Sequence, residues 1–190
     1  LPQPVHDAVA PEELEAGARL EVAQAEPAAA LLDEPGGQAH LYIAPDVILF
    51  VNGIPLVVIE CKAPSASGDH SEPMEEAIKQ LQRYSNQRHW FDGNEGNERL
   101  FWTNQFNVAT CYDEARVGTL GAQAIHFMEW KDTSPVPMDD VAAAMGKATL
   151  SSQEKLVAGM LRPANLLDII RHFILFDQTG GKTIKKVCRY

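Results

Sequence analysis

Three charged residues interrupt an otherwise apolar stretch, PDVILFVNGIPLVVIECK, at positions 45–62. Asp46 stands where this stretch begins, and Glu60 and Lys62 stand where it ends. Carboxylates are preferred oxygen ligands of hard divalent cations, and a neighbouring lysine can orient a water molecule or neutralise charge on a phosphate. These residue types would suffice for metal-assisted hydrolysis of a phosphodiester, with Mg²⁺ as the expected metal.

This chemistry requires the two carboxylates to meet, which depends on the pairing of two predicted strands. The stretch is rich in β-branched residues, and Asn52-Gly53 at its centre predicts a hairpin. Side chains alternate along a strand, so Glu60 and Lys62 share a face. A loop with an odd number of residues, or a bulge, would place Asp46 opposite Glu60 on that face, whereas a strict two-residue turn would not. Without such a register, Glu60 and Lys62 are only an exposed ion pair worth about 0–1 kcal/mol.

A second group of polar residues lies on a predicted helix beginning near Pro73. Apolar residues recur there at helical spacing, and Gln80 and Tyr84 are one turn apart on the same face. Such a pair could hold a DNA phosphate or orient the lysine. The alternative is that Tyr84 belongs to the core and Gln80 is exposed.

The remaining elements are predicted from periodicity and from turn residues. A helix is expected within residues 11–31, and short strands are expected at 99–104, at 107–112 and near 125–130. Helices are expected at 141–150, 152–161 and 164–175. The sequence QTGGKT at 178–183 resembles the end of a phosphate-binding loop, but Phe176 stands where that motif needs glycine, so we interpret it as a helix stop followed by a basic connector.

The charge distribution permits a nucleic-acid partner despite a net charge of −10. Residues 1–40 hold eight acids and one base, or −7, which leaves −3 for the rest of the chain, and residues 171–190 carry +4. Three separated cysteines argue against a disulfide framework and a thiolate zinc site. No apolar run is long enough for a membrane span, so we expect a cytoplasmic location and no membrane partner.

The chemistry-bearing residues also carry a family resemblance. Asp46 followed by Glu60-Cys61-Lys62 resembles the PD-(D/E)xK nuclease signature, and Gln80 with Tyr84 resembles the QxxxY motif that accompanies it. From about residue 44 to residue 190, the chain resembles the N-terminal part of the restriction (R) subunit of type I restriction-modification enzymes. The segments that carry this likeness are NGIPLVVIECK, the predicted helix with Gln80, EARVGTL, Trp130-Lys131 and LLDIIRHFILFDQTGGKTIKKVCRY.

The resemblance implies a restriction-endonuclease-like α/β fold with a mixed central sheet flanked by helices. It implies that Asp46, Glu60 and the Cys61 backbone carbonyl bind Mg²⁺, that Lys62 is catalytic, and that Gln80 and Tyr84 assist. Such nucleases often take a further acidic residue from an early helix. The candidates in this chain are Glu12, Glu13, Glu15 and Glu21.

The domain organisation and partners expected from the resemblance follow the same family. We expect an acidic helical segment at 1–40, an endonuclease core at 41–150, and a helical connector at 151–190 that leads to an ATP-driven motor. The expected activity is Mg²⁺-dependent cleavage of double-stranded DNA, with ATP bound only by the motor and with modification and specificity subunits as partners. Two alternatives remain: a RecB-like nuclease of the same fold, and a catalytically inactive module for docking or DNA contact.

Overall fold

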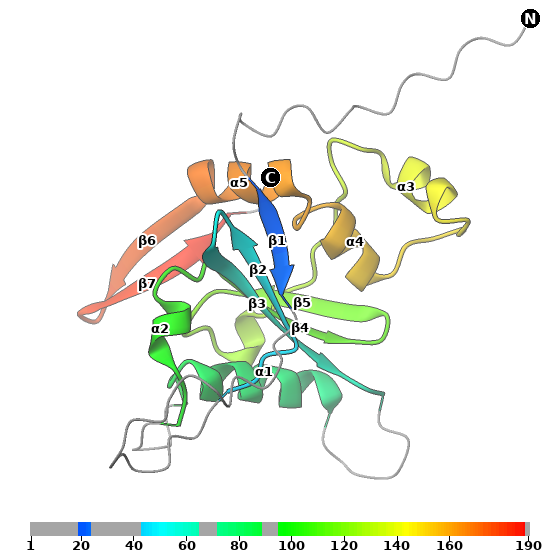
Figure 1. Ribbon diagram of the computed structural model, residues 1–190. Coiled ribbons are helices and arrows are strands. Elements are labelled where there is room, and N and C mark those ends of the chain that lie inside the picture. The colour runs from blue at the N-terminus through cyan, green and yellow to red at the C-terminus, as the bar shows by residue number, and fades with distance from the viewer. Residues whose placement is uncertain (1–18, 24–42, 65–71, 89–94, 189–190) are drawn as a thin grey trace, which may run out of the picture.

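A mixed five-stranded β-sheet forms the centre of the computed structural model, which describes residues 19–23, 43–64, 72–88 and 95–188 (Figure 1). Its order follows the sequence from β1 to β5. Strands β3 and β4 are parallel, and all other neighbours are antiparallel. The strands are β1 (Leu20–Ala23), β2 (Val47–Val51), β3 (Ile54–Lys62), β4 (Phe106–Cys111) and β5 (Glu114–Gly118).

Helices cover both faces of this sheet, which confirms the predicted α/β class. In Figure 1, α1 lies along the lower side of the sheet, and α4 and α5 lie above it. A separate hairpin of β6 (Ile174–Thr179) and β7 (Lys182–Val187) follows α5. No helix in the described part of the chain is long and apolar enough to cross a membrane. The helices are α1 (Pro73–Tyr84), α2 (Glu98–Phe101), the 3₁₀ turn η2 (Ala124–His126), α3 (Met138–Ala144), α4 (Ser152–Ala158) and α5 (Pro163–His172).

The β2–β3 hairpin owes its tight turn to Asn52 and Gly53. Both residues have positive φ angles, 51° and 76°, which asparagine and glycine tolerate better than other residue types. A β-bulge then interrupts the ladder between Leu49 and Phe50. The bulge adds one residue, Leu56, to β3 and so changes which residues of β2 and β3 face each other.

Two clusters of buried side chains lie on opposite faces of the sheet. One joins the sheet to α4 and α5, and it includes Val57, Phe106 and Leu166. The other joins the sheet to α1, and it includes Val58 and Leu81. Adjacent β3 residues Val57 and Val58 belong to different clusters because side chains alternate along a strand.

Helix α1 confirms the helix predicted from Pro73 onward. Its buried residues recur every three or four positions, and Pro73 occupies the first turn, where a missing N–H costs no helical hydrogen bond. The buried stripe is what docks α1 against the sheet. It consists of Met74, Ala77, Ile78, Leu81 and Tyr84.

Two of the predicted elements before residue 105 are wrong in type. Residues Leu20–Ala23, expected within a helix, form strand β1 at the edge of the sheet, and the rest of the predicted helix lies outside the described residues. Residues Glu98–Phe101 form helix α2 where a strand was expected, because Asn97 caps the helix by accepting a hydrogen bond from the backbone N–H of Arg99.

The prediction of a helical connector at 151–190 is wrong only in its second half. The first half holds helices α4 and α5, but α5 ends at His172, and the residues that follow form the β6–β7 hairpin, which turns at Gly180 and Gly181 with positive φ angles. The hairpin is tied to the rest of the fold by Lys185, whose Nζ donates to the Asn104 carbonyl at 2.7 Å.

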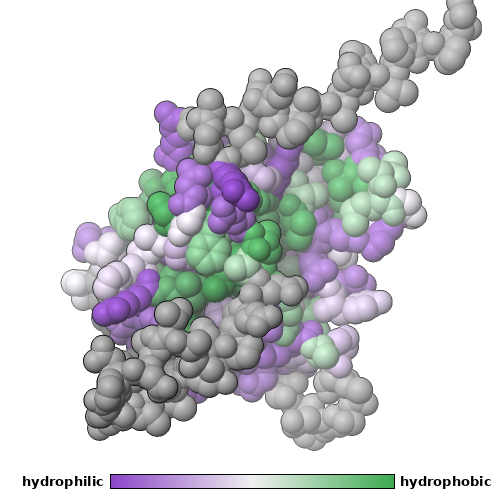
Figure 2. Space-filling model, viewed as in Figure 1, coloured by the Kyte–Doolittle hydropathy of each residue, from purple (hydrophilic) through white to green (hydrophobic). Residues whose placement is uncertain are grey.

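Figure 2 shows hydrophobic residues gathered near the middle of the face viewed, with hydrophilic residues around them.

Candidate functional site

The bulge at Leu56 of β3 sets the register that directs Asp46 to the same face of the sheet as Glu60. The turn between β2 and β3 contains two residues, and by itself would direct the Asp46 side chain to the other face of the sheet. Beyond the bulge, Val47 pairs with Ile59. The same register continued by one position directs Asp46 to the face that carries Glu60. The irregularity that a two-carboxylate site requires is therefore present.

Glu60 is a buried carboxylate with one unused oxygen. Its exposed fraction is only 1%. Burial raises the pKa of Glu60 above its ordinary value, Lys62 opposes this rise, and the negative charge of Asp46 adds to it. Among the described residues, Oε2 of Glu60 has no hydrogen-bond partner. A buried carboxylate oxygen without a partner is costly, so this position favours a proton or a bound cation.

Lys62 connects the sheet to helix α1. Its Nζ donates to Oε1 of Glu60 at 2.7 Å and to Oε1 of Gln80 at 2.6 Å. The side chain of Lys62 is about one quarter exposed, whereas that of Glu60 is almost fully buried. The ammonium group is therefore held by two partners on a side chain that remains partly accessible to a substrate.

Gln80 and Tyr84 continue this chain of hydrogen bonds. Nε2 of Gln80 donates to the Tyr84 hydroxyl, which in turn donates to the backbone carbonyl of Ala44 at 3.1 Å. Burial raises the pKa of Tyr84, so its hydroxyl keeps its proton at neutral pH. The network of hydrogen bonds therefore runs from Lys62 in β3 through α1 to Ala44, two positions before Asp46. It connects the segment that carries Asp46 to the strand that carries Glu60 and Lys62.

The Ala44 carbonyl was not anticipated from the sequence. A backbone carbonyl accepts hydrogen bonds whatever side chain its residue carries, so nothing in the residue type of Ala44 indicates this role.

The structure also bears on the two alternatives for Gln80 and Tyr84, which were a polar role and a place in the core. Tyr84 is a buried core residue, and it nevertheless joins the polar network through its hydroxyl.

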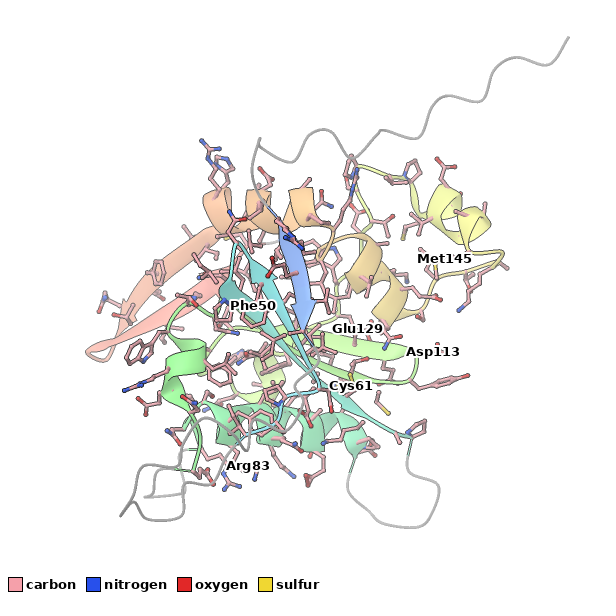
Figure 3. The ribbon with its side chains drawn as sticks, viewed as in Figure 1. Phe50, Cys61, Arg83, Asp113, Glu129 and Met145 are labelled. Atoms are coloured by element: carbon pink, nitrogen blue, oxygen red, sulfur yellow. The ribbon has the colours of Figure 1, made fainter. Side chains whose placement is uncertain are left out.

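Asp46 is the exposed member of the site. Its Oδ2 accepts a hydrogen bond from the backbone N–H of Cys61 at 2.7 Å, which holds the carboxylate beside the end of β3. In Figure 3, Cys61 lies at the end of β3 close to α1, whereas Phe50 lies nearer the turn. The Cys61 thiol is exposed rather than buried, and it stands on the opposite face of β3 from Glu60.

The further acidic ligand remains unassigned. Glu21 lies in β1 opposite Phe50, four positions along β2 from Asp46, and its carboxylate pairs with Arg19 at 3.4 Å. It therefore stands away from the site. The other three candidates, Glu12, Glu13 and Glu15, lie outside the described residues. Within the described ranges, no three His, Cys, Asp or Glu side chains come together as a metal-binding group.

The raised pKa of Glu60 predicts how its replacement affects stability. A group whose pKa is raised by folding stabilises the folded state below its unfolded pKa, and this contribution is lost as the pH rises through the folded pKa. In the presence of chelator, we expect Glu60→Gln to melt at a higher temperature than the original protein at pH 7, because glutamine carries no charge into this buried position. The difference should shrink as the pH falls toward about 4.

Thermal melts across this pH range would measure the effect. Glu114→Gln is the matched control because Glu114 is exposed at the start of β5, and it should show no comparable gain. A Glu60→Gln protein that is less stable than the original at pH 7 would contradict the prediction.

Comparison with known proteins relates the sequence of this chain to one family. Residues 38–124 match the family model described as type I restriction enzyme R protein N terminus. The chain is 33% identical over 147 residues to the "Type I restriction enzyme HindI endonuclease subunit" of Haemophilus influenzae, covering 77% of this chain and 12% of that protein. It is 29% identical over 150 residues to the "Putative type I restriction enzyme MjaVIIIP endonuclease subunit" of Methanocaldococcus jannaschii, covering 78% of this chain and 12% of the relative.

The mixed sheet with helices on both faces defines an α/β fold of the restriction-endonuclease-like type. Together with the matches, it identifies the chain as a member of the family of type I restriction enzyme R protein N-terminal regions. The chain spans about one eighth of the length of the curated relatives that it matches.

Proposed function

We propose that this chain is the metal-dependent nuclease region of a type I restriction enzyme, and that it hydrolyses phosphodiester bonds of double-stranded DNA. The observation that carries the proposal is the Asp46 carboxylate, held by the Cys61 N–H beside a buried Glu60 whose second oxygen has no partner among the described residues. Two carboxylates placed opposite each other repel unless a cation lies between them. The names of the relatives, both endonuclease subunits, support the same reading.

The residues present suit a divalent cation. Asp46, Glu60 and the Cys61 backbone carbonyl would hold Mg²⁺, since hard cations prefer oxygen ligands. The bound metal would polarise the phosphate and lower the pKa of a coordinated water molecule. Asp46 is accessible to solvent and Glu60 is not, so a cation held by both would lie at the border between the interior and the substrate.

Lys62 would act on the substrate side of this site. Its ammonium group carries the positive charge closest to Glu60, and it is positioned by both Glu60 and Gln80. A fixed cation beside a scissile phosphate stabilises the negative charge that develops during hydrolysis, and it can orient the attacking water. Gln80 and Tyr84 would be positioning residues, because their contacts reach Lys62 and Ala44 rather than the expected location of the phosphate.

The larger assembly follows from the family. Type I enzymes join DNA cleavage to an ATP-driven motor, and we propose that the motor, together with modification and specificity subunits, brings DNA to this site. ATP would bind to the motor and not to residues 178–183, because that segment forms the turn of the β6–β7 hairpin rather than a loop between a strand and a helix.

The test is plasmid cleavage by the complete R subunit with its partner subunits, ATP and Mg²⁺. Asp46→Asn keeps the size of the side chain and removes its charge. Cleavage should fall about a hundredfold, because loss of one carboxylate weakens the metal site, and chelation of the metal should abolish cleavage by the original protein. ATP hydrolysis should persist in the variant.

Asp113→Asn is the matched control. Asp113 is an exposed carboxylate in the β4–β5 turn (Figure 3) and lies outside the network around Glu60, so its replacement should leave cleavage unchanged. Unchanged cleavage in Asp46→Asn would overturn the proposed site and favour the inactive docking module instead.

A further inference from the structure

The turn between β4 and β5 carries a residue type that its backbone conformation disfavours. The turn consists of Tyr112 and Asp113, and the φ angle of Tyr112 is 53°. Positive φ angles are rare for bulky residues, and two-residue turns usually place glycine, asparagine or aspartate at such positions. The β2–β3 turn of the same sheet has Asn52 and Gly53 there. The tyrosine therefore makes its turn less stable than glycine would.

Helix α4 holds this turn in place. The backbone N–H of Gln153 donates to the Asp113 carbonyl at 3.1 Å. On the other side of the turn, the backbone N–H of Ala115 donates to Oγ of Ser152 at 2.9 Å. An unfavourable backbone conformation persists only where surrounding contacts determine it, and such positions cluster at functional sites. The conformation therefore points to a role for the Tyr112 side chain beyond the fold.

The Tyr112 side chain contributes little to the packing of the protein. It is 72% exposed and belongs to neither of the two buried clusters. Among the described residues, its hydroxyl has no hydrogen-bond partner. A side chain that is neither buried nor bonded gives no stability that would offset the cost of the turn.

The turn lies at the same edge of the sheet as the candidate site. Strands β3 and β4 are parallel, and Lys62 at the end of β3 pairs with Cys111 at the end of β4. Tyr112 is the next residue along the chain. Figure 3 labels Cys61 near the end of β3 and Asp113 in the turn. Paired strands are about 4.8 Å apart, so a DNA backbone held at Lys62 passes within reach of the tyrosine ring.

We propose that Tyr112 contacts the DNA strand that is cut, with its ring packed against the sugar and the base edge of the nucleotide beside the scissile phosphate. This inference rests on the proposed function. The exposed acidic residues Asp113 and Glu114 follow Tyr112, so this turn offers no positive charge to a phosphate group. An uncharged aromatic ring can still bury apolar surface against a nucleotide.

The competing explanation is that Tyr112 is an incidental surface residue, since single apolar side chains are common on protein surfaces. The two explanations differ in what removal of the ring does. If the ring contacts DNA, its removal lowers cleavage even though the turn becomes more stable. If the ring is incidental, its removal changes only the stability of the turn.

The experiment measures plasmid cleavage by the complete R subunit with its partner subunits, ATP and Mg²⁺, for the original protein, Tyr112→Phe and Tyr112→Gly. Hydrogen exchange of the β4 and β5 amides is followed in the same proteins. We expect Tyr112→Gly to cleave about tenfold more slowly because the contact of the ring is lost. Protection of these amides should rise about threefold, because glycine tolerates the positive φ angle. Tyr112→Phe keeps the ring and should cleave within about twofold of the original.

Trp102→Ala is the matched control. Trp102 is 75% exposed and adjoins Thr103, whose hydroxyl donates to the Pro55 carbonyl at the start of β3. It therefore lies at the other end of these strands from Lys62, and its replacement should leave cleavage unchanged. Contact is tested directly with the photoreactive residue p-benzoylphenylalanine, which should crosslink to DNA from position 112 and not from position 102.

Each outcome bears on one of the two proposals. Cleavage by Tyr112→Gly at the rate of the original protein would overturn the role of Tyr112 and leave the metal site intact. Slower cleavage together with lower amide protection would also overturn it, because the ring would then support only the fold. A crosslink from position 112 to another polypeptide instead of DNA would overturn the DNA contact. Unchanged cleavage in Asp46→Asn would instead overturn the proposed function, and the inference with it.

Discussion

Replacing Lys62 with alanine is expected to lower DNA cleavage by about 10³-fold or more while the subunit continues to hydrolyse ATP. Two effects act together. The substitution removes the cation that would stabilise the transition state, and it removes the partner of a buried carboxylate. Since Lys62 lowers the pKa of Glu60, its loss raises that pKa further, and less of the ionised carboxylate remains at neutral pH to bind a metal.

The two effects can be separated by their pH dependence. Raising the pH should recover the part of the loss that comes from protonation of Glu60, but not the part that comes from the missing ammonium group. Gln80→Ala is the informative comparison, because it removes a hydrogen bond that positions Lys62 and leaves the charge in place. Its loss should be closer to tenfold, about the cost of one hydrogen bond to a charged group. Cleavage by Lys62→Ala within fivefold of the original would exclude a catalytic role.

The largest expected effect on stability belongs to Phe106. Its side chain is fully buried in the inner strand β4, in the cluster shared with α4 and α5. Phe106→Ala would leave a cavity between the sheet and these helices. We expect a loss of about 3–5 kcal/mol in the free energy of unfolding, which is a large part of the stability of an ordinary domain.

Hydrogen exchange of the β4 amides would measure this loss, because exchange reports the opening of the sheet even within a longer polypeptide. Phe176→Ala is the matched control. Phe176 lies in β6 with an exposed fraction of 65%, so the same substitution there should cost less than about 1 kcal/mol. Similar losses for the two variants would mean that Phe106 does not occupy a close-packed position.

The sequence alone indicated which residues belong to the candidate site better than it indicated how they are arranged. The hairpin, helix α1 and the five chemistry-bearing side chains all follow from residue types and spacing. The bulge did not, because the Asn52-Gly53 turn by itself specifies the wrong register and nothing in the residue type of Leu56 marks it as the extra residue. From the sequence, a two-carboxylate site could be predicted only on the condition that the hairpin register brings Asp46 and Glu60 to the same face. The metal, the substrate and the roles of the side chains remain predictions.

The errors in the fold have local causes. Helical periodicity in α5 continues through the apolar residues Phe173 and Ile174, but the helix ends at His172 and Ile174 begins β6. Pairing between β6 and β7 is a contact between segments on either side of a glycine turn, which periodicity does not detect. Strand β1 has the same origin, since Leu20–Ala23 becomes a strand through its pairing with β2.

The two buried clusters on opposite faces of the sheet divide the consequences of mutation into two kinds. The network from Glu60 to Tyr84 lies on the α1 face, whereas Phe106 and the residues of α4 and α5 pack on the other. Damage on the α4–α5 face would reduce how many molecules are folded in a cell without changing what each folded molecule does. Damage on the α1 face would change both the number of folded molecules and the activity of each. Selection for abundance and selection for the rate of cutting would therefore act on different surfaces of the same sheet.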